Sequence, residues 1–203
     1  MTTDFAARHT CDSPEWYTPS AFVEAAREVM GGIDLDPASH ADANLIVRAT
    51  QYYTAETDGL DWDAWDGRVF LNPPGGLVRE FWTALMFAYN KEDAPFKRRV
   101  TQAIWIGYSL EQLQTLQACP VTPLDFPICI TAKRIAFIEN AAKRTARLAK
   151  VDAENARRVA AGEKPRARNE RSDSPSHSNY ITYLGPFVDR FERTFSRFGK
   201  VKR

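Results

Sequence analysis

The sequence predicts an α/β protein with a mostly parallel sheet and helices on both of its faces. Strand-like segments alternate with amphipathic helical segments along most of the 203 residues, and this alternation is typical of α/β folds. Short apolar runs at 68–71 and 100–106 predict buried strands. Apolar residues make up 44% of the chain, which is enough to form a core.

The first predicted helix covers 19–30. Thr18 is the expected N-cap and Pro19 the expected first helical residue. Gly31 and Gly32 predict its end. One apolar face is expected from Phe22, Ala25, Ala26, Val29 and Met30. A strand over 33–36, ended by Pro37, is predicted next.

The later elements follow the same alternation. Residues 38–47 are compatible with a short helix, and turns are expected around 52–53 and 58–60. Apolar residues at helical spacing predict a helix over 77–89. The remaining predictions are strands at 100–106, 128–130 and 179–184, a helix near 110–117, and a last helix with Phe187, Phe191, Phe195 and Phe198 on one side.

The sequence predicts a flexible leader at 1–13 and one domain at 14–203. Charge is distributed unevenly along the chain. Residues 1–66 carry 13 acidic and 3 basic side chains, whereas 133–171 carry 12 basic and 5 acidic ones. The basic insertion, 139–172, is helix-prone and has little apolar surface. It indicates either a DNA-contacting element or a solvated helical excursion. The candidate contacts are Lys133, Arg134, Arg144, Arg147, Arg157 and Arg158.

Composition also argues against several classes of protein. No run of about 18 apolar residues predicts a membrane span, and the first residues do not have the pattern of a secretory signal. Three cysteines without CxxC spacing favour a reducing cytoplasm over a disulfide framework. His9 and Cys11 have no second pair, so no metal site is predicted.

Asn72-Pro73-Pro74 directly follows a predicted buried strand. Ligands of open parallel sheets bind beyond the carboxyl ends of the strands. Proline has no N–H, so this loop presents hydrogen-bond acceptors. Fixed acceptors suit an exocyclic amino group, which has two N–H donors, although a strand-to-helix turn could need the same residues for geometry alone.

Two other strings add to this pattern. Thr18, in Glu15-Trp16-Tyr17-Thr18-Pro19, precedes a helix and could bind a carboxylate. Asp36, in Asp34-Leu35-Asp36-Pro37-Ala38-Ser39, ends a strand and could accept from a ribose hydroxyl or pair with an ammonium. S-adenosylmethionine carries adenosine, an ammonium and a carboxylate in one molecule.

The strings WYTP, DLDPAS, DGLDW and FLNPPGG occur in this order, followed by KRIAFI at 133–138 and SPSHSNYITYLG at 174–185. Together they resemble the phage-type DNA N6-adenine methyltransferases, often called the phage Dam family. The likeness covers roughly 14–138 and 174–186. It implies a Rossmann-like, S-adenosylmethionine-dependent methyltransferase of phage or prophage origin in a bacterial cytoplasm, which could mask DNA from host restriction.

The resemblance also implies roles for individual residues. Tyr17, Thr18 and Pro19 match the segment that holds the methionine carboxylate of the cofactor. Asp36, Pro37 and Ala38 match the first cofactor motif, and Asp58 matches the acidic residue that meets the cofactor's adenine. Asn72, Pro73 and Pro74 match the catalytic tripeptide, which acts on an adenine flipped out of double-stranded DNA.

Two positions depart from the family pattern. Gly75 stands where an aromatic residue usually stacks on the flipped base, and Ser39-His40 replaces a glycine-rich motif. The stacking ring is then expected elsewhere or is absent. Phe81, Trp82 and Phe137 are candidates, although the core face of their helix is the favoured place for Phe81 and Trp82. Alternative interpretations are a methyltransferase for cytosine N4 or RNA, and a catalytically inactive DNA-binding protein on this scaffold. A nicotinamide-dependent enzyme is disfavoured because no GxGxxG follows the first strand.

Overall fold

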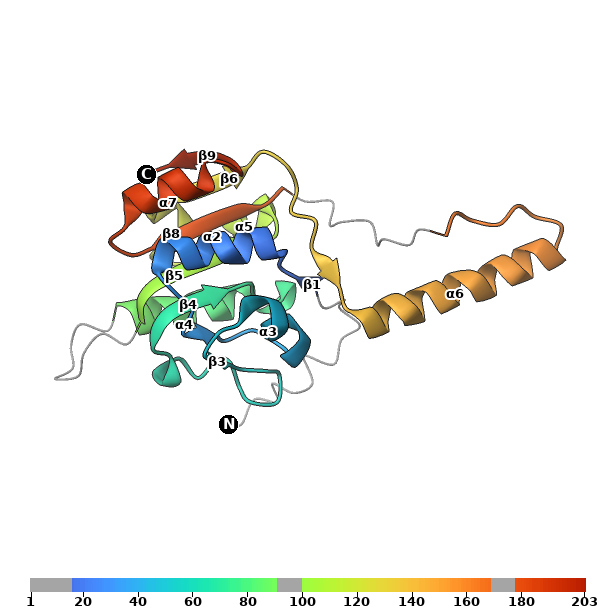
Figure 1. The fold of residues 1–203 in the computed structure, drawn as a ribbon, viewed down its shortest axis with the longest axis horizontal. Helices are drawn as coiled ribbons and strands as arrows, with labels where there is room; N and C mark the ends of the chain where they lie inside the picture. Colours follow the sequence, from blue (N-terminus) through green and yellow to red (C-terminus); the bar gives the residue numbers. More distant parts are fainter. Residues whose placement is uncertain (1–15, 91–99, 169–177) are drawn as a thin grey trace.

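The computed structural model describes residues 16–90, 100–168 and 178–203 (Figure 1). It contains a seven-stranded sheet of order β3-β2-β4-β5-β8-β6-β9, flanked by helices, so the predicted α/β class is confirmed. The predicted leader, including His9 and Cys11, and Glu15 lie outside the described residues. The strands are Leu35–Asp36 (β2), Gln51–Tyr52 (β3), Gly67–Leu71 (β4), Val100–Gly107 (β5), Ile128–Thr131 (β6), Tyr180–Leu184 (β8) and Gly199–Lys202 (β9).

Most strands of this sheet run in one direction. β2 is parallel to β3 and to β4, and β4 is parallel to β5. β8 is antiparallel to both β5 and β6, so β6 runs in the direction of β5, and β9 is antiparallel to β6. The sheet is therefore mixed: β8 and β9 alone oppose the common direction among its described strands.

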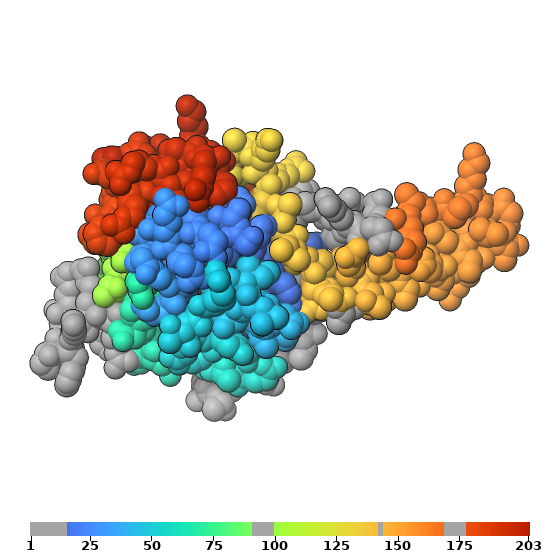
Figure 2. All heavy atoms as spheres, viewed as in Figure 1, coloured from blue at the N-terminus to red at the C-terminus, as the bar shows by residue number. Residues whose placement is uncertain are grey.

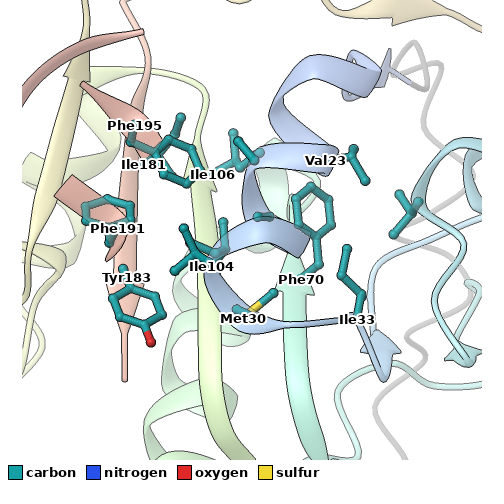
Figure 3. Packing of buried hydrophobic residues seen from close by; sticks show 14 of the residues in the cluster. Val23, Met30, Ile33, Phe70, Ile104, Ile106, Ile181, Tyr183, Phe191 and Phe195 are labelled. Atoms are coloured by element: carbon teal, nitrogen blue, oxygen red, sulfur yellow. The ribbon is translucent and has the colours of Figure 1, made fainter. Parts of the chain in front are cut away.

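Helices cover both faces of the sheet. The helices α2 (Ser20–Met30), α3 (Ala41–Val47) and α7 (Val188–Phe195) contribute to one apolar cluster, and α4 (Val78–Tyr89) and α5 (Leu110–Leu116) contribute to another. Successive residues of β4 point to opposite clusters: Phe70 to the first, Val69 and Leu71 to the second. Figure 3 shows the first cluster between α2 and the central strands.

The ends of α2 match the sequence at one terminus only. Gly31 adopts a left-handed conformation (φ 80°) and its N–H donates to the Arg27 carbonyl at 2.8 Å, as expected for a glycine that ends a helix. At the other end the predicted N-cap is wrong. Pro19 occupies that position, without a side-chain cap, so the Thr18 hydroxyl is not used by the helix.

Four short strands were not predicted from the sequence. They are the edge strands β3 and β9, and the two-stranded antiparallel sheet of β1 (Trp16–Tyr17) and β7 (Ile138–Glu139). The predicted strand at 33–36 is reduced to the two residues of β2. Only the last residue of KRIAFI, Ile138, belongs to a strand.

An ion pair fixes β2 against β4. Arg68 donates from Nε and Nη2 to the two carboxylate oxygens of Asp34 at 2.7 and 2.6 Å, and its backbone N–H donates to the same carboxylate at 2.8 Å. The Asp34 backbone N–H donates to the Arg68 carbonyl at 2.9 Å. The guanidinium holds the pKa of Asp34 below its usual value, so the carboxylate stays ionised.

A long helix extends from the body. It is α6 (Ala141–Ala160), about 30 Å long at 1.5 Å per residue, and Figure 1 shows it projecting away from the sheet. Within the described parts of the chain, no helix combines the length and apolarity needed to span a bilayer.

Candidate functional site

Three chain segments leave the sheet side by side at one edge. β2, β4 and β5 are parallel neighbours, so their carboxyl ends lie at the same edge, about 4.8 Å apart from strand to strand. The register pairs Leu35 with Val69 and Leu71 with Trp105. The segments that begin at Asp36, Asn72 and Tyr108 are therefore next to one another, and we call this row the carboxyl edge.

The chain reverses its lateral direction at this edge. β2 connects through α3 to β3 on one side, whereas β4 connects through α4 to β5 on the other. The helices of these two connections contribute to opposite apolar clusters. In open α/β sheets such a switch point leaves a crevice beyond the strand ends where ligands bind. Here the switch point lies between Asp36 and Asn72.

Asp36 is a buried carboxyl group at the end of β2. It is 4% exposed, and one of its oxygens accepts a hydrogen bond from the Ala38 N–H at 3.3 Å. Burial raises the pKa of Asp36 to about 7, although the Ser39 side chain and the Ala38 N–H act in the opposite direction. Pro37 is buried and Ala38 half-buried. Asp36 is therefore poised to bind a donor or a cation.

The loop that carries Asp58 lies directly against the end of β2. A Cβ added at Gly59 would be 1.8 Å from the Pro37 carbonyl oxygen, so only glycine permits this approach. The buried Trp65 donates from Nε1 to the Gly59 carbonyl at 3.1 Å and holds the loop there. Asp58 itself is exposed, with φ 49°, and accepts from the Leu60 N–H at 3.2 Å.

Asn72-Pro73-Pro74 presents fewer free acceptors than the sequence predicts. The Pro74 carbonyl accepts from the Leu77 N–H at 2.9 Å, within a short 3₁₀ helix (Gly75–Leu77), so it is not free. Asn72 is half-buried and its side-chain amide makes no hydrogen bond within the described chain; the same holds for the carbonyl of Pro73. Two acceptors remain available at this corner.

Tyr17, Thr18 and Pro19 precede α2 at the same edge. α2 leads through the tight Gly31-Gly32 turn into β2, so its amino end points toward the carboxyl edge. Tyr17 is buried, and its hydroxyl accepts a hydrogen bond from Asn140 Nδ2. Thr18 is 4% exposed, and its hydroxyl makes no hydrogen bond with the described residues.

None of the three aromatic residues proposed for base stacking is available for it. Phe81 and Trp82 are core residues of α4, and Phe137 is buried in the cluster beneath α2. Phe137 is 8% exposed, so little of its surface can meet a base in this structure. Lys133 and Arg134, in the loop between β6 and β7, are exposed.

The basic arm, α6 with the residues 161–168 that follow it, starts from the carboxyl edge. β6 runs with β5 and ends there, and the antiparallel β8 begins there, so the end of β6 and the start of β8 both lie at this edge. Figure 2 shows the arm standing out from the body. The chain after α6 turns back along it, because Asn155 exchanges two hydrogen bonds with the Arg166 backbone at 2.7 and 3.0 Å.

The predicted DNA contacts on the arm differ in their surroundings. Arg144 and Arg157 are exposed. Arg147 instead binds the carboxylate of Glu139 through Nε and Nη2 at 2.9–3.2 Å, which attaches α6 to β7. Arg158 pairs with Glu163 at 3.1 Å beyond the helix end. Arg147 and Arg158 therefore have structural roles.

Two residues at this edge were not recognised from the sequence. Tyr108 follows β5 and its ring lies beside Gly75. Asn179, fully buried before β8, donates from Nδ2 to the Tyr108 carbonyl at 2.9 Å and accepts from the Ile135 N–H at 2.7 Å. Asn179 therefore connects the ends of β5, β6 and β8. A polar residue before a buried apolar run is the only sequence signal for it.

Two cavities are found away from the row of strand ends. One, of about 410 Å³, lies between α4 and the segment around Leu60 and Trp62. The other, of about 280 Å³, is lined by residues 186–190 and Arg193, after the carboxyl end of β8 and so at the opposite edge.

Comparison of the chain with protein-family models, with curated proteins and with solved structures finds no match.

The contact of Gly59 with Pro37 yields the first prediction. Gly59→Ala should lower the free energy of unfolding by about 1–3 kcal/mol, because the methyl group forces the loop off the end of β2. Gly76→Ala, where a Cβ meets nothing within 4 Å, is the matched control. Urea denaturation followed by circular dichroism measures both, and equal stability of the two variants would contradict the close contact.

Proposed function

We propose that this chain is an S-adenosylmethionine-dependent DNA methyltransferase that modifies adenine N6. The observation that carries the proposal is the meeting of Asp36 and Asn72 on either side of the switch point. The sequence strings resemble one family, and the topology supports a common site at the carboxyl edge for the strings that contain Asp36 and Asn72. A Rossmann-like methyltransferase fold is the finer architecture that we infer.

The residues present fit the cofactor. The buried carboxyl group of Asp36 would accept from the ribose hydroxyls, and Asp58, on the adjoining loop, would meet the adenine. The Thr18 hydroxyl and the first amides of α2 would receive the carboxylate. When bound, S-adenosylmethionine supplies a methyl group that is already activated on a sulfonium.

The double-proline corner would act on the amino group of the substrate. Asn72 Oδ1 and the Pro73 carbonyl oxygen accept its two N–H donors, which draws the nitrogen lone pair out of conjugation with the ring. Pro73 and Pro74 restrict the backbone, so both acceptors stay in position. Positioning and electrostatics then supply most of the acceleration, without a covalent intermediate.

The role of Asn72 is tested by its replacement with alanine. Purified protein is incubated with DNA and radiolabelled cofactor, and the hydrolysed nucleosides are separated by chromatography. Asn72→Ala should lower methyl transfer by at least about 10²-fold, the usual loss for one polar group that acts in the transition state. Cofactor binding, measured by calorimetry, should change less than about twofold. Asn90→Ala, at the exposed end of α4, is the control.

The same assay separates the alternatives. Label in N6-methyladenine supports the proposal, whereas label in N4-methylcytosine would identify cytosine N4 as the methyl acceptor. Cofactor binding without label, or DNA binding without cofactor binding, would overturn the proposed activity.

Cofactor affinity should depend on pH through Asp36. Donors to its carboxylate bind the ionised form, whereas burial raises its pKa to about 7. Affinity should therefore fall as the pH drops below 7, by up to about tenfold per unit, and binding should release a proton. Calorimetry in two buffers of different ionisation enthalpy measures that proton, and Asp36→Asn should abolish its release. A flat profile in the parent protein would contradict this role.

The stability of the fold should depend on pH in the opposite direction from the cofactor affinity. Between pH 3.8 and about 7 the folded protein keeps a proton on Asp36 that the unfolded chain has released, so this group makes the fold less stable as the pH rises. Stability and affinity measured on the same samples thus separate the two effects.

DNA affinity should depend on the basic arm. Replacing Lys150 and Arg157, both exposed on α6, with alanine should weaken binding to duplex DNA. It should also reduce the slope of log affinity against log salt by about 0.9 for each phosphate that the arm no longer neutralises. Lys202→Ala, on the edge strand β9, is the control. An unchanged slope would identify the arm as a solvated excursion.

A further inference from the structure

Tyr108 occupies the space into which a side chain at position 75 would grow. A Cβ added at Gly75 would lie 3.0 Å from Cε1, 3.1 Å from the hydroxyl oxygen and 3.3 Å from Cζ of Tyr108. These distances are tighter than ordinary van der Waals contact, so a side chain at 75 would require the Tyr108 ring to shift by a few tenths of an ångström. Gly75 has no positive φ, so its backbone does not itself require glycine. The neighbouring ring is the reason that a side chain is disfavoured here.

The register of the sheet explains this contact. β4 and β5 pair Leu71 with Trp105, so three residues beyond that pair Tyr108 is level with Pro74. Its ring thus adjoins the residue that follows the double proline, although it comes from the next strand. This ring position cannot be seen in the sequence, because Tyr108 lies 33 positions after Gly75.

The backbone that carries the ring is anchored on both sides. The Tyr108 N–H donates to Gln112 Oε1 at 3.0 Å, and its carbonyl accepts from Asn179 Nδ2 at 2.9 Å. Gln112 and Asn179 are both buried. Tyr108 itself is half-buried, and its anchored ring lies beside the acceptor corner.

We propose that Tyr108 is the stacking surface for the unpaired base that enters this site. The inference rests on the proposed function and names a specificity-determining residue for it. Tyr108, at the end of β5, would supply the aromatic ring that the family pattern places at position 75. Glycine at 75 leaves room for this ring. An aromatic face binds bases with about 1–3 kcal/mol each.

The first test measures stacking without catalysis. The probe is a short oligothymidine strand with one central 2-aminopurine, whose fluorescence is quenched when it stacks on an aromatic ring. The parent protein should quench it, and Tyr108→Ala should bind it about 5- to 150-fold more weakly. Tyr108→Phe should stay within about twofold of the parent, because the ring and not the hydroxyl is required. Phe87→Ala, a 56% exposed aromatic on α4, is the control.

The second test exchanges the two residues. Gly75→Tyr alone should weaken binding of the probe, because two rings compete for one space. Gly75→Tyr combined with Tyr108→Ala should restore both quenching and affinity. Such rescue is non-additive, and a merely structural Tyr108 would not produce it.

The outcomes keep the two proposals apart. Absence of quenching by the parent protein, equal binding by Tyr108→Ala, or a double variant weaker than both single ones would each overturn the role of Tyr108. The proposed function fails separately, if the parent protein transfers no methyl group to DNA in the nucleoside assay.

Discussion

The register between β2 and β4 is the constraint on which the whole site depends. If β2 slipped by one residue relative to β4, the side chains of Asp36 and Asn72 would lie on opposite faces of the sheet. The Asp34 carboxylate prevents it by accepting both the guanidinium and the backbone N–H of Arg68. A Cβ added at Gly32 would lie only 2.6–2.7 Å from the atoms of the same guanidinium. The double glycine thus ends α2 and makes room for the ion pair.

Apart from α6, which its helix-prone composition predicted, the elements that the sequence predicted are those whose stability comes from apolar burial. β4, β5, β6 and β8 are apolar runs, and α2 and α4 have apolar faces. The strands that were missed are held by backbone pairing at edges: Gln51 and Tyr52 are both exposed, and β9 reads Gly-Lys-Val-Lys. Their pairing depends on the neighbouring strand, so neither composition nor periodicity reveals it.

The candidate site was predictable where one short string holds the chemistry, as at Asp36 and Asn72. It was not predictable where partners come from different elements. Glu139 lies in β7, so its pairing with Arg147 follows no helical spacing and could not be read from the sequence. Tyr108 adjoins Gly75 only through the β4–β5 register.

Charge and length together explain why a basic arm is useful to an acidic body. A DNA substrate would be repelled by the net charge of −10 on residues 1–66, the third of the chain that contains Asp36 and Asp58. Screening at physiological salt limits that repulsion to about 8 Å, whereas α6 extends about 30 Å. The exposed basic residues of the arm, among them Arg157, would meet phosphates beyond the reach of that acidic segment. Under the proposed function, the duplex is held by the arm, and one unpaired nucleotide alone has to approach the carboxyl edge.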